Sequence, residues 1–234
     1  MGFANVADSL YSIKKAVFDD KVVKIGALAK WMAEDWDEAE DMQAYFLKKL
    51  PKYGNDIDEV DEMAVKVLNH FCDELKKYKN FRGGAFWPGI FSVGFHLAFG
   101  SFTAATPDGR WSGDVLGNGL TPTTGNALGG PTLVVNSVTK LPLKRIYNGS
   151  NLNLRLPGKK VKSENLEAFI KTYFEKGGVQ VQFNMIDSDT LRDAQKNPDK
   201  YQDLVVRISG FSVIFTGLSD TAQDEIISRT EYEV

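Results

Sequence analysis

The stretch VVRISGFSV, residues 205–213, decides how this chain is interpreted. It lies within the apolar run 204–215, which is typical of a β-strand, but Gly210 interrupts the run. A glycine inside a strand weakens the strand and often marks a bend or a close approach of the backbone. On spacing alone, the segment therefore predicts a turn or bulge at Gly210.

Composition and charge describe an ordinary globular protein. The chain has 234 residues, enough for one large domain or two small ones with a substantial core. Hydrophobic residues make up 43% and charged residues 25%, the usual proportions for a globular domain. The net charge of −3 indicates no basic surface for nucleic acid or an anionic membrane, so neither is expected as a partner.

The single cysteine, Cys72, predicts a reducing compartment, because it cannot form an internal disulfide. The first ten residues lack the basic and apolar regions of a secretory signal, and no apolar run approaches the length of a membrane span. We therefore expect a cytoplasmic protein. Two histidines and one cysteine, widely separated, offer no zinc pattern, so no metal site is expected.

The first third of the chain is predicted to be helical. Apolar residues recur at helical spacing, most clearly over 58–77, where acidic residues begin the segment and lysines end it in accord with the helix dipole. Pro51 and Gly54-Asn55 break the pattern between helices. We expect residues 1–80 to form a helical segment, with helices near 6–17, 24–33, 37–50 and 58–77.

Beyond residue 80 the pattern becomes mixed. Glycine and proline are frequent up to residue 131, and short apolar runs alternate with amphipathic segments. The expected strands lie at 90–99, 132–138, 151–156, 179–185 and 204–215. The expected helices begin at Ser163, at Asp187 or Ser188, and at Ser219, each with a capping side chain. The predicted fold class is α/β, with a helical block followed by mixed strands and helices.

The residues around Gly210 narrow the interpretation further. Arg207, Ile208, Ser209, Gly210 and Phe211 together resemble the glycyl radical signature, in which an arginine, an aliphatic residue, a small residue, the glycine and an aromatic follow one another. The family usually has tyrosine where this chain has Phe211. That difference removes a hydroxyl group and keeps the ring.

Similar segments occur in family order along the whole chain, so it is identified as a member of the glycyl radical enzyme family. The resemblance implies the C-terminal part of a ten-stranded α/β barrel, with residues 81–234 supplying barrel strands and the glycyl radical domain. The matching segments are GFANVADSLYSIKK (2–15), YGND (53–56), TPDGR (106–110), residues 119–125, NMIDSDTLRDAQKNPDKY (184–201) and DEIISRT (224–230).

The resemblance also implies a chemistry for Gly210. A radical-SAM activating enzyme would remove one hydrogen from its α-carbon, and the radical would be shared with the flanking amide groups. No other cofactor would be bound, and the iron–sulfur cluster would belong to the activating enzyme. A side chain would oppose the planar geometry that sharing requires, and glycine has none. Val206, Ile208, Val213 and Ile214 flank the loop, and we expect them to keep it dry.

In this family the stored radical is passed to a cysteine thiol, which then takes hydrogen from a small-molecule substrate. Cys72 does not resemble that cysteine, and its place in the amphipathic segment 58–77 indicates a packing role. The cysteine is therefore expected on a partner chain or in an upstream region. We expect a radical-storing subunit or fragment of a lyase, closest to the dehydratases. The alternative is a spare-part protein that restores an oxygen-damaged enzyme without being catalytic itself.

Other candidate residues were weighed against simpler roles. Phe91 and Val93 lie in PGIFSVG (88–94), which resembles the family strand that lines part of the substrate cavity, so they are possible substrate contacts. His96, in the same apolar run, is expected to be a hydrogen-bonded core residue. Asp108 and Arg110 are expected to have a structural role in an Asp-Gly turn.

Overall fold

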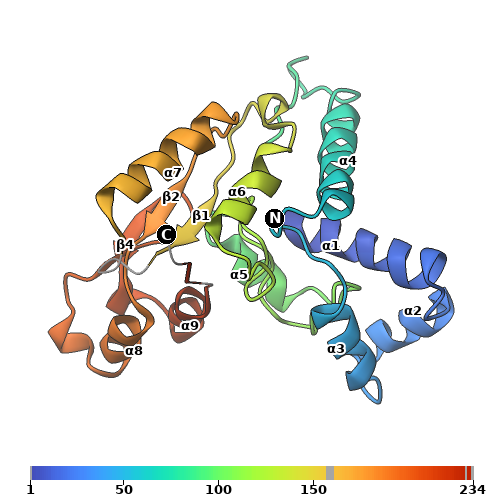
Figure 1. Ribbon diagram of the computed structural model, residues 1–234, viewed down its shortest axis with the longest axis horizontal. Helices are drawn as coiled ribbons and strands as arrows, with labels where there is room; N and C mark the ends of the chain where they lie inside the picture. The colour runs from blue at the N-terminus through green and yellow to red at the C-terminus, as the bar shows by residue number, and fades with distance from the viewer. Residues whose placement is uncertain (1, 157–160, 230, 233–234) are drawn as a thin grey trace.

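The computed structural model describes residues 2–156, 161–229 and 231–232. Thr230, the last residue of one matching segment, lies outside the described residues. The elements follow one another from a helical N-terminal block, through a loop-rich middle, to a C-terminal part in which short strands and helices alternate (Figure 1). This mixed α/β character agrees with the predicted fold class.

The N-terminal block consists of helices, as predicted. They are α1 (Phe3–Ile13), which continues into a π-helical turn at Lys14–Asp19, α2 (Ile25–Ala33), α3 (Glu40–Lys48) and α4 (Asp58–Leu75). α1 packs against α4, whose first turn carries three acidic residues that suit the positive end of the helix dipole.

Two predicted strands are wrong, because both segments contain helices. Within 90–99, only Ile90 forms a β-bridge, and α5 (Phe95–Ser101) begins after Gly94, whose φ of 86° breaks any extended conformation. Residues 132–138 belong to α6 (Pro131–Thr139). There Pro131 occupies the first turn, where its missing N–H and fixed φ favour a helix over the β-preference of the valines that follow.

The three predicted strands nearer the C-terminus are present in shorter form. β1 (Asn153–Arg155) pairs in parallel with β2 (Gln182–Asn184), and the connection between them includes α7 (Ser163–Glu175). β3 (Val205–Arg207) and β4 (Ser212–Ile214) form an antiparallel hairpin. Within the described ranges these are two separate two-stranded sheets, and no closed ten-stranded barrel is formed by them.

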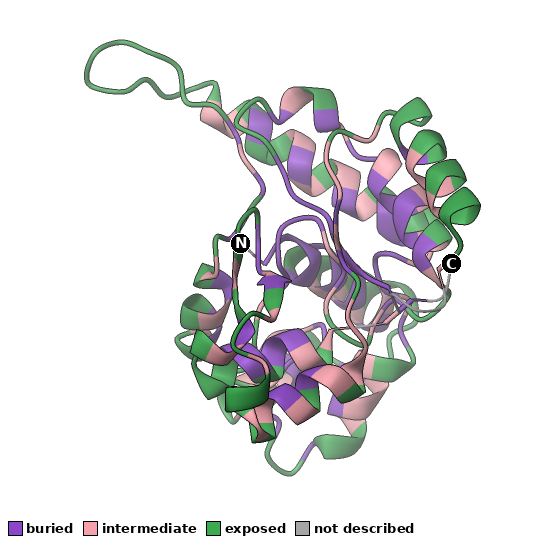
Figure 2. Ribbon diagram, turned by 90° about the vertical axis from the view of Figure 1, so that its left-hand side faces the viewer, coloured by how far each residue is buried: buried purple, intermediate pink, exposed green. Residues whose placement is uncertain are grey.

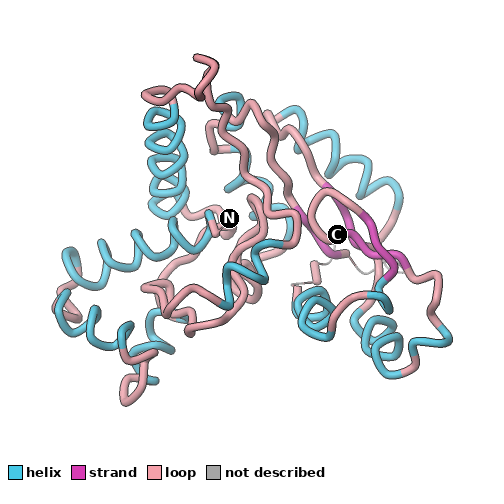
Figure 3. Tube along the Cα trace, turned by 180° about the vertical axis from the view of Figure 1, so that it is seen from behind, coloured by secondary structure: helices cyan, strands magenta, loops and turns pink. Residues whose placement is uncertain are grey.

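Two helices complete the C-terminal part. α8 (Ser188–Lys196) begins after Asp187, whose carboxylate accepts a 2.7 Å hydrogen bond from the Thr190 N–H. Asp187 and Ser188 were both expected as candidates for the N-cap, and Asp187 is the one that caps the helix. α9 (Asp220–Ser228) packs against α8. The tube in Figure 3 shows both helices on one side of the short strands.

Three apolar clusters stabilise these parts. The largest joins α1, α4, α6, α7 and β1, and a second surrounds the fully buried Trp36. The third lies under the β3–β4 hairpin and includes Leu191, Val206, Ile208 and Phe215. Residues 76–87, after α4, are all exposed and project as an arm (Figure 2).

Arg155 connects β1 to the C-terminal helices. Its guanidinium is 2% exposed and donates to the carbonyl oxygens of Ile227 (2.8 Å), Arg229 (3.1 Å) and Ile186 (3.2 Å). It also forms a 2.8 Å ion pair with Glu231. A cation at the end of α9 satisfies carbonyl groups that the helix itself leaves unpaired.

We expect Arg155→Met to lower the free energy of unfolding by about 3 kcal/mol, because it leaves buried carbonyls and Glu231 without their partner. Lys171→Met is the control, since it removes the exposed 2.6 Å pair with Glu167 and should change stability by less than about 0.5 kcal/mol. Urea unfolding of both variants measures the difference. Equal stabilities would contradict a connecting role for Arg155.

Candidate functional site

The site is built on the tip of the β3–β4 hairpin. Residues 208–211 connect the two strands, and the Ile208 N–H donates to the Phe211 carbonyl at 3.0 Å. Gly210 has a φ of 92°, which L-residues with side chains rarely adopt, and a β-carbon there would have no neighbouring atom within 4 Å. The turn predicted at Gly210 is therefore confirmed, and its α-carbon faces open space.

Side chains from other elements hold the strand that leads into this loop. Asn184, at the end of β2, accepts from the Arg207 N–H at 2.7 Å and donates to the Arg207 carbonyl at 2.8 Å. Arg229, after α9, donates to the carbonyls of Arg207 (3.0 Å) and Ile208 (3.1 Å). The two side chains thus take the place of a neighbouring strand and tie the two small sheets together.

A cluster of polar side chains lies directly beneath Gly210; we call it the Ser209 cluster, comprising Ser92, Asn118, Asn151 and Ser209. The Ser209 Oγ contacts Asn118 Oδ1 (2.9 Å), Asn151 Nδ2 (2.9 Å) and Ser92 Oγ (3.1 Å). All four residues are buried, and they come from four separate stretches of the chain. The cluster therefore fixes the loop against the middle of the protein.

His96 and Glu225 extend this network toward α9. The His96 Nδ1 lies 2.9 Å from Ser92 Oγ, and its Nε2 lies 3.5 Å from Glu225 Oε1. His96 is completely buried, as expected, and lies on a helix and not on a strand; its Nδ1 contacts Ser92, while its Nε2 makes no hydrogen bond among the described residues. Burial alone would raise the pKa of Glu225, but the charge of Arg229, the neighbouring His96 and hydrogen bonds from Arg229 hold that pKa at about 2.

An open cavity of about 500 Å³ lies against the loop. Val93, on its wall, has a φ of 49°, a strained conformation for a β-branched residue, and its N–H donates to Ser209 Oγ at 3.3 Å. The structure thus brings Phe91 and Val93 to the same cavity as Gly210. The cavity is lined by Phe91, Val93, Gly149, Ser150, Asn151, Gln180, Arg207, Ser209, Gly210 and Phe211.

Gly210 is exposed in this chain, which differs from the dry surroundings that its apolar neighbours suggested. Val206 and Ile208 are buried, but they point into the apolar cluster under the hairpin. Ile214 is 49% exposed and Phe211 is 38% exposed. The residues described here therefore cover one side of the loop and leave the Gly210 side open.

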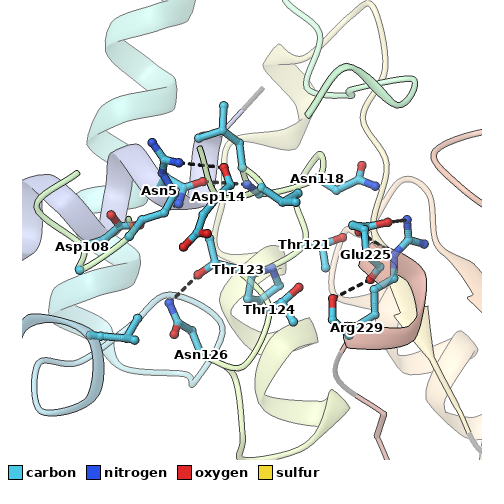
Figure 4. Close-up of a pocket in the computed structure, with 18 of the residues that line it drawn as sticks. Asn5, Asp108, Asp114, Asn118, Thr121, Thr123, Thr124, Asn126, Glu225 and Arg229 are labelled. Carbon is cyan, nitrogen blue, oxygen red and sulfur yellow. Dashed lines mark hydrogen bonds and ion pairs between the residues drawn. The ribbon is translucent and has the colours of Figure 1, made fainter. Parts of the chain in front are cut away.

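A second pocket, of about 280 Å³, lies on the α9 side of the network (Figure 4). Figure 4 shows Glu225 and Arg229 on one side of it and Asn5, Asp108 and Thr123 on the other, with amide and hydroxyl groups between them. Many polar side chains line this pocket, but apolar atoms make up the larger part of its surface, and Asp108, Glu225 and Arg229 already have partners within the chain.

Asp108 and Arg110 have structural partners. Asp108 accepts a 2.7 Å hydrogen bond from Asn5 Nδ2, and the Arg110 guanidinium donates to the carbonyls of Thr103 (2.9 Å) and Asp114 (2.8 Å). The Arg110 contacts close the 103–114 segment and the Asp108 contact joins it to α1, in agreement with the structural role predicted for this pair.

Cys72 lies on α4 within the largest apolar cluster, and it does not line the cavity beside Gly210. Burial raises the pKa of its thiol, which disfavours the reactive thiolate. The packing role predicted for Cys72 agrees with this position.

One group of carboxylates among the described residues has the spacing of a metal site: Asp56, Asp58 and Asp61. The Lys140 ammonium lies 2.7–2.8 Å from an oxygen of each, so a protein cation already occupies the centre of the group.

No helix in the described ranges is long and apolar enough to span a membrane.

Comparison with known proteins places these features in a family. Residues 1–100 match the family model described as "Pyruvate formate lyase-like", and residues 116–216 match the model described as "Glycine radical". A glycerol-bound B12-independent glycerol dehydratase from Clostridium butyricum superposes on this chain with a TM-score of 0.95 and 43% identity. The chain belongs to the glycyl radical enzyme family.

Other glycyl radical enzymes show the same relationship. The chain is 40% identical to the probable dehydratase YbiW of Escherichia coli over 99% of its own length, and 35% identical to the trans-4-hydroxy-L-proline dehydratase of Clostridioides difficile, also over 99%. The superposition on the glycerol dehydratase includes the whole of this chain. In each case it spans about 30% of the relative's length.

The residues that support the loop at Gly210 were not predicted as supports from the sequence. Asn184 and Arg229 lie in two of the matching segments, but sequence resemblance does not reveal their contacts. Asn118 and Asn151 were given no role in the loop, because single asparagines match no spacing rule. Gln182, which contacts Gly210 directly, was also missed.

The Glu225–Arg229 pair predicts a specific acid sensitivity. Because the folded pKa of Glu225 is below its ordinary value of 4.5, the pair stabilises the fold above that value and the contribution is lost as pH falls toward 2. We expect Glu225→Gln to lower the free energy of unfolding by about 3 kcal/mol at pH 7 and by much less near pH 2.5. Urea titrations at both values measure this, and a pH-independent difference would contradict it.

Proposed function

We propose that this chain supplies the glycyl radical of a dehydratase or related lyase, with the radical stored on the α-carbon of Gly210. The observation that carries the proposal is the position of Gly210: it sits at the tip of a hairpin, in a conformation that favours glycine, beside an open cavity. Arg207, Ile208, Ser209 and Phe211 form the radical loop that presents it.

The proposed radical transfer needs a cysteine thiol that residues 1–234 do not provide. The stored radical would take a hydrogen atom from that S–H bond, which restores the Gly210 C–H bond and leaves a thiyl radical. Cys72 is unsuited, because it is packed in another part of the fold. We infer that the cysteine comes from an upstream region or a partner chain, and that this part covers the open side of Gly210.

A small hydroxylated molecule is the proposed substrate class. Three relatives named above are dehydratases, two of them named for glycerol and trans-4-hydroxy-L-proline. In this chain Phe91 and Val93 line the cavity beside Gly210, together with polar residues that include Asn151 and Gln180. A wall of apolar and polar side chains suits a small molecule with both carbon and hydroxyl groups.

Activation is proposed to depend on a radical-SAM activating enzyme, which would remove one hydrogen atom from Gly210. The "Glycine radical" match over residues 116–216 supports this requirement. A spare-part role would need only the radical-bearing portion. The "Pyruvate formate lyase-like" match over residues 1–100 favours a part of a catalytic assembly instead.

Gly210→Ala tests the proposal. The chain would be co-expressed with its cysteine-bearing part and an activating enzyme under anaerobic conditions. We expect the wild type to give a doublet in electron paramagnetic resonance, split by the remaining α-hydrogen, and air to cleave it at Gly210. The alanine variant should give neither, because its side chain opposes the planar radical.

Gly177→Ala is the matched control for backbone strain. Gly177 has a φ of 95° and, like Gly210, open space where a β-carbon would lie. Both substitutions should destabilise the fold by about 1–2 kcal/mol, but only Gly210→Ala should lose the signal. A wild-type chain without any signal, despite an active activating enzyme, would refute radical storage.

A further inference from the structure

Gln182 makes the one direct side-chain hydrogen bond to Gly210 among those observed in the described ranges. The Gly210 N–H donates to Gln182 Oε1 at 3.1 Å. Gln182 begins β2 and is 6% exposed, while Gly210 itself is exposed toward the cavity. The amide that flanks the radical carbon is therefore held by a buried side chain from a different sheet.

The orientation of this carboxamide is set by the Gly210 N–H, which can only donate. At its other end, Gln182 Nε2 donates to Asn153 Oδ1 on the adjacent strand β1. If the carboxamide were reversed, its NH₂ group would face the Gly210 N–H, so two donors would oppose each other and Asn153 Oδ1 would lose its donor. The acceptor oxygen is thus directed at the Gly210 N–H.

This contact has a consequence for a radical on the α-carbon. Such a radical is stabilised when the amide nitrogen donates electron density and the carbonyl group withdraws it, which requires both groups to be coplanar with the radical centre. The Gly210 φ of 92° places the preceding amide plane nearly perpendicular to that arrangement, so the backbone must rotate about the N–Cα bond when the hydrogen is lost. An acceptor on the N–H increases the electron density on nitrogen and holds this amide plane, so the α-carbon and its carbonyl group take up the rotation. A preorganised dipole acts most strongly where water is excluded.

We propose that Gln182 is a positioning residue that fixes the Gly210 amide by accepting its N–H and stabilises the stored radical. The inference rests on the proposed function, because it assigns a role within radical storage. A purely structural role for Gln182, as a link between β1, β2 and the hairpin, would affect stability and leave the electronic properties of the radical unchanged. The experiment must therefore read the radical itself.

Gln182→Leu removes the acceptor at similar volume, and Gln182→Glu retains an acceptor oxygen in either protonation state. Both would be activated in the complete assembly, and the amide-proton coupling of the radical measured by electron nuclear double resonance. We expect Gln182→Leu to change that coupling and to lower the fraction of chains carrying the radical roughly three- to tenfold, the effect of one lost hydrogen bond. Gln182→Glu should restore a coupling close to that of the wild type.

Gln223→Leu is the matched control. Gln223 is another 6% exposed glutamine, and it donates to the Phe215 and Leu218 carbonyls at 3.2 and 3.1 Å without contacting Gly210. It should lower stability and leave the radical coupling unchanged. If the coupling and radical fraction of Gln182→Leu also match the wild type, the positioning role is overturned while radical storage stands.

Hydrogen exchange at the Gly210 N–H tests the hydrogen bond to Gln182 without the radical. It is followed in the unactivated chain, so a folding defect that arises after activation cannot affect the result. The wild type should be protected despite the exposure of Gly210, and Gln182→Leu should exchange roughly tenfold faster. Unprotected exchange in the wild type would overturn the inference. A protected amide in a chain that never gives a radical would instead overturn the proposed function, and the stabilising role with it.

Discussion

The loop that carries Gly210 depends on side chains that satisfy the backbone of β3, the strand before it. A two-stranded hairpin is marginally stable by itself, and β3 has no further strand beside it in the described ranges. Asn184 pairs with both backbone groups of Arg207, and Arg229 donates to the carbonyls of Arg207 and Ile208. Each contact joins the loop to an element that is itself packed, so the position of Gly210 is set by the surrounding fold and not by the hairpin.

The same arrangement explains why one side of the loop is open. The apolar residues of β3 point into the cluster beneath the hairpin, and polar groups clamp the backbone from the side. Nothing among these contacts requires the α-carbon of Gly210 to be covered. The proposed radical storage would require water and oxygen to be excluded from Gly210. Under that proposal the covering surface comes from outside these residues, and the chain spans about 30% of its relatives' length.

Sequence patterns predicted the parts of the fold that depend on local preferences. The periodicity of 58–77 gave α4, and the glycine in an apolar run gave the turn at Gly210. Residues 132–138 were mistaken for a strand, because a short apolar run has no period that distinguishes a buried helix. The side chains that hold the loop at Gly210 could not be predicted from the sequence. Each hydrogen bond joins segments 21–117 residues apart, and the sequence around either partner gives no sign of the other.

One hydroxyl connects the wall of the cavity to the radical loop. Ser209 Oγ accepts from the Val93 N–H, and Val93 holds a strained φ of 49°. A strained φ of this kind persists only where the surrounding structure holds the residue in place. Here Ser209, the residue before Gly210, holds the backbone of Val93. Any displacement of the loop would release Val93, whose side chain lines the cavity. The distance between the Gly210 α-carbon and this wall is therefore determined by contacts within the chain.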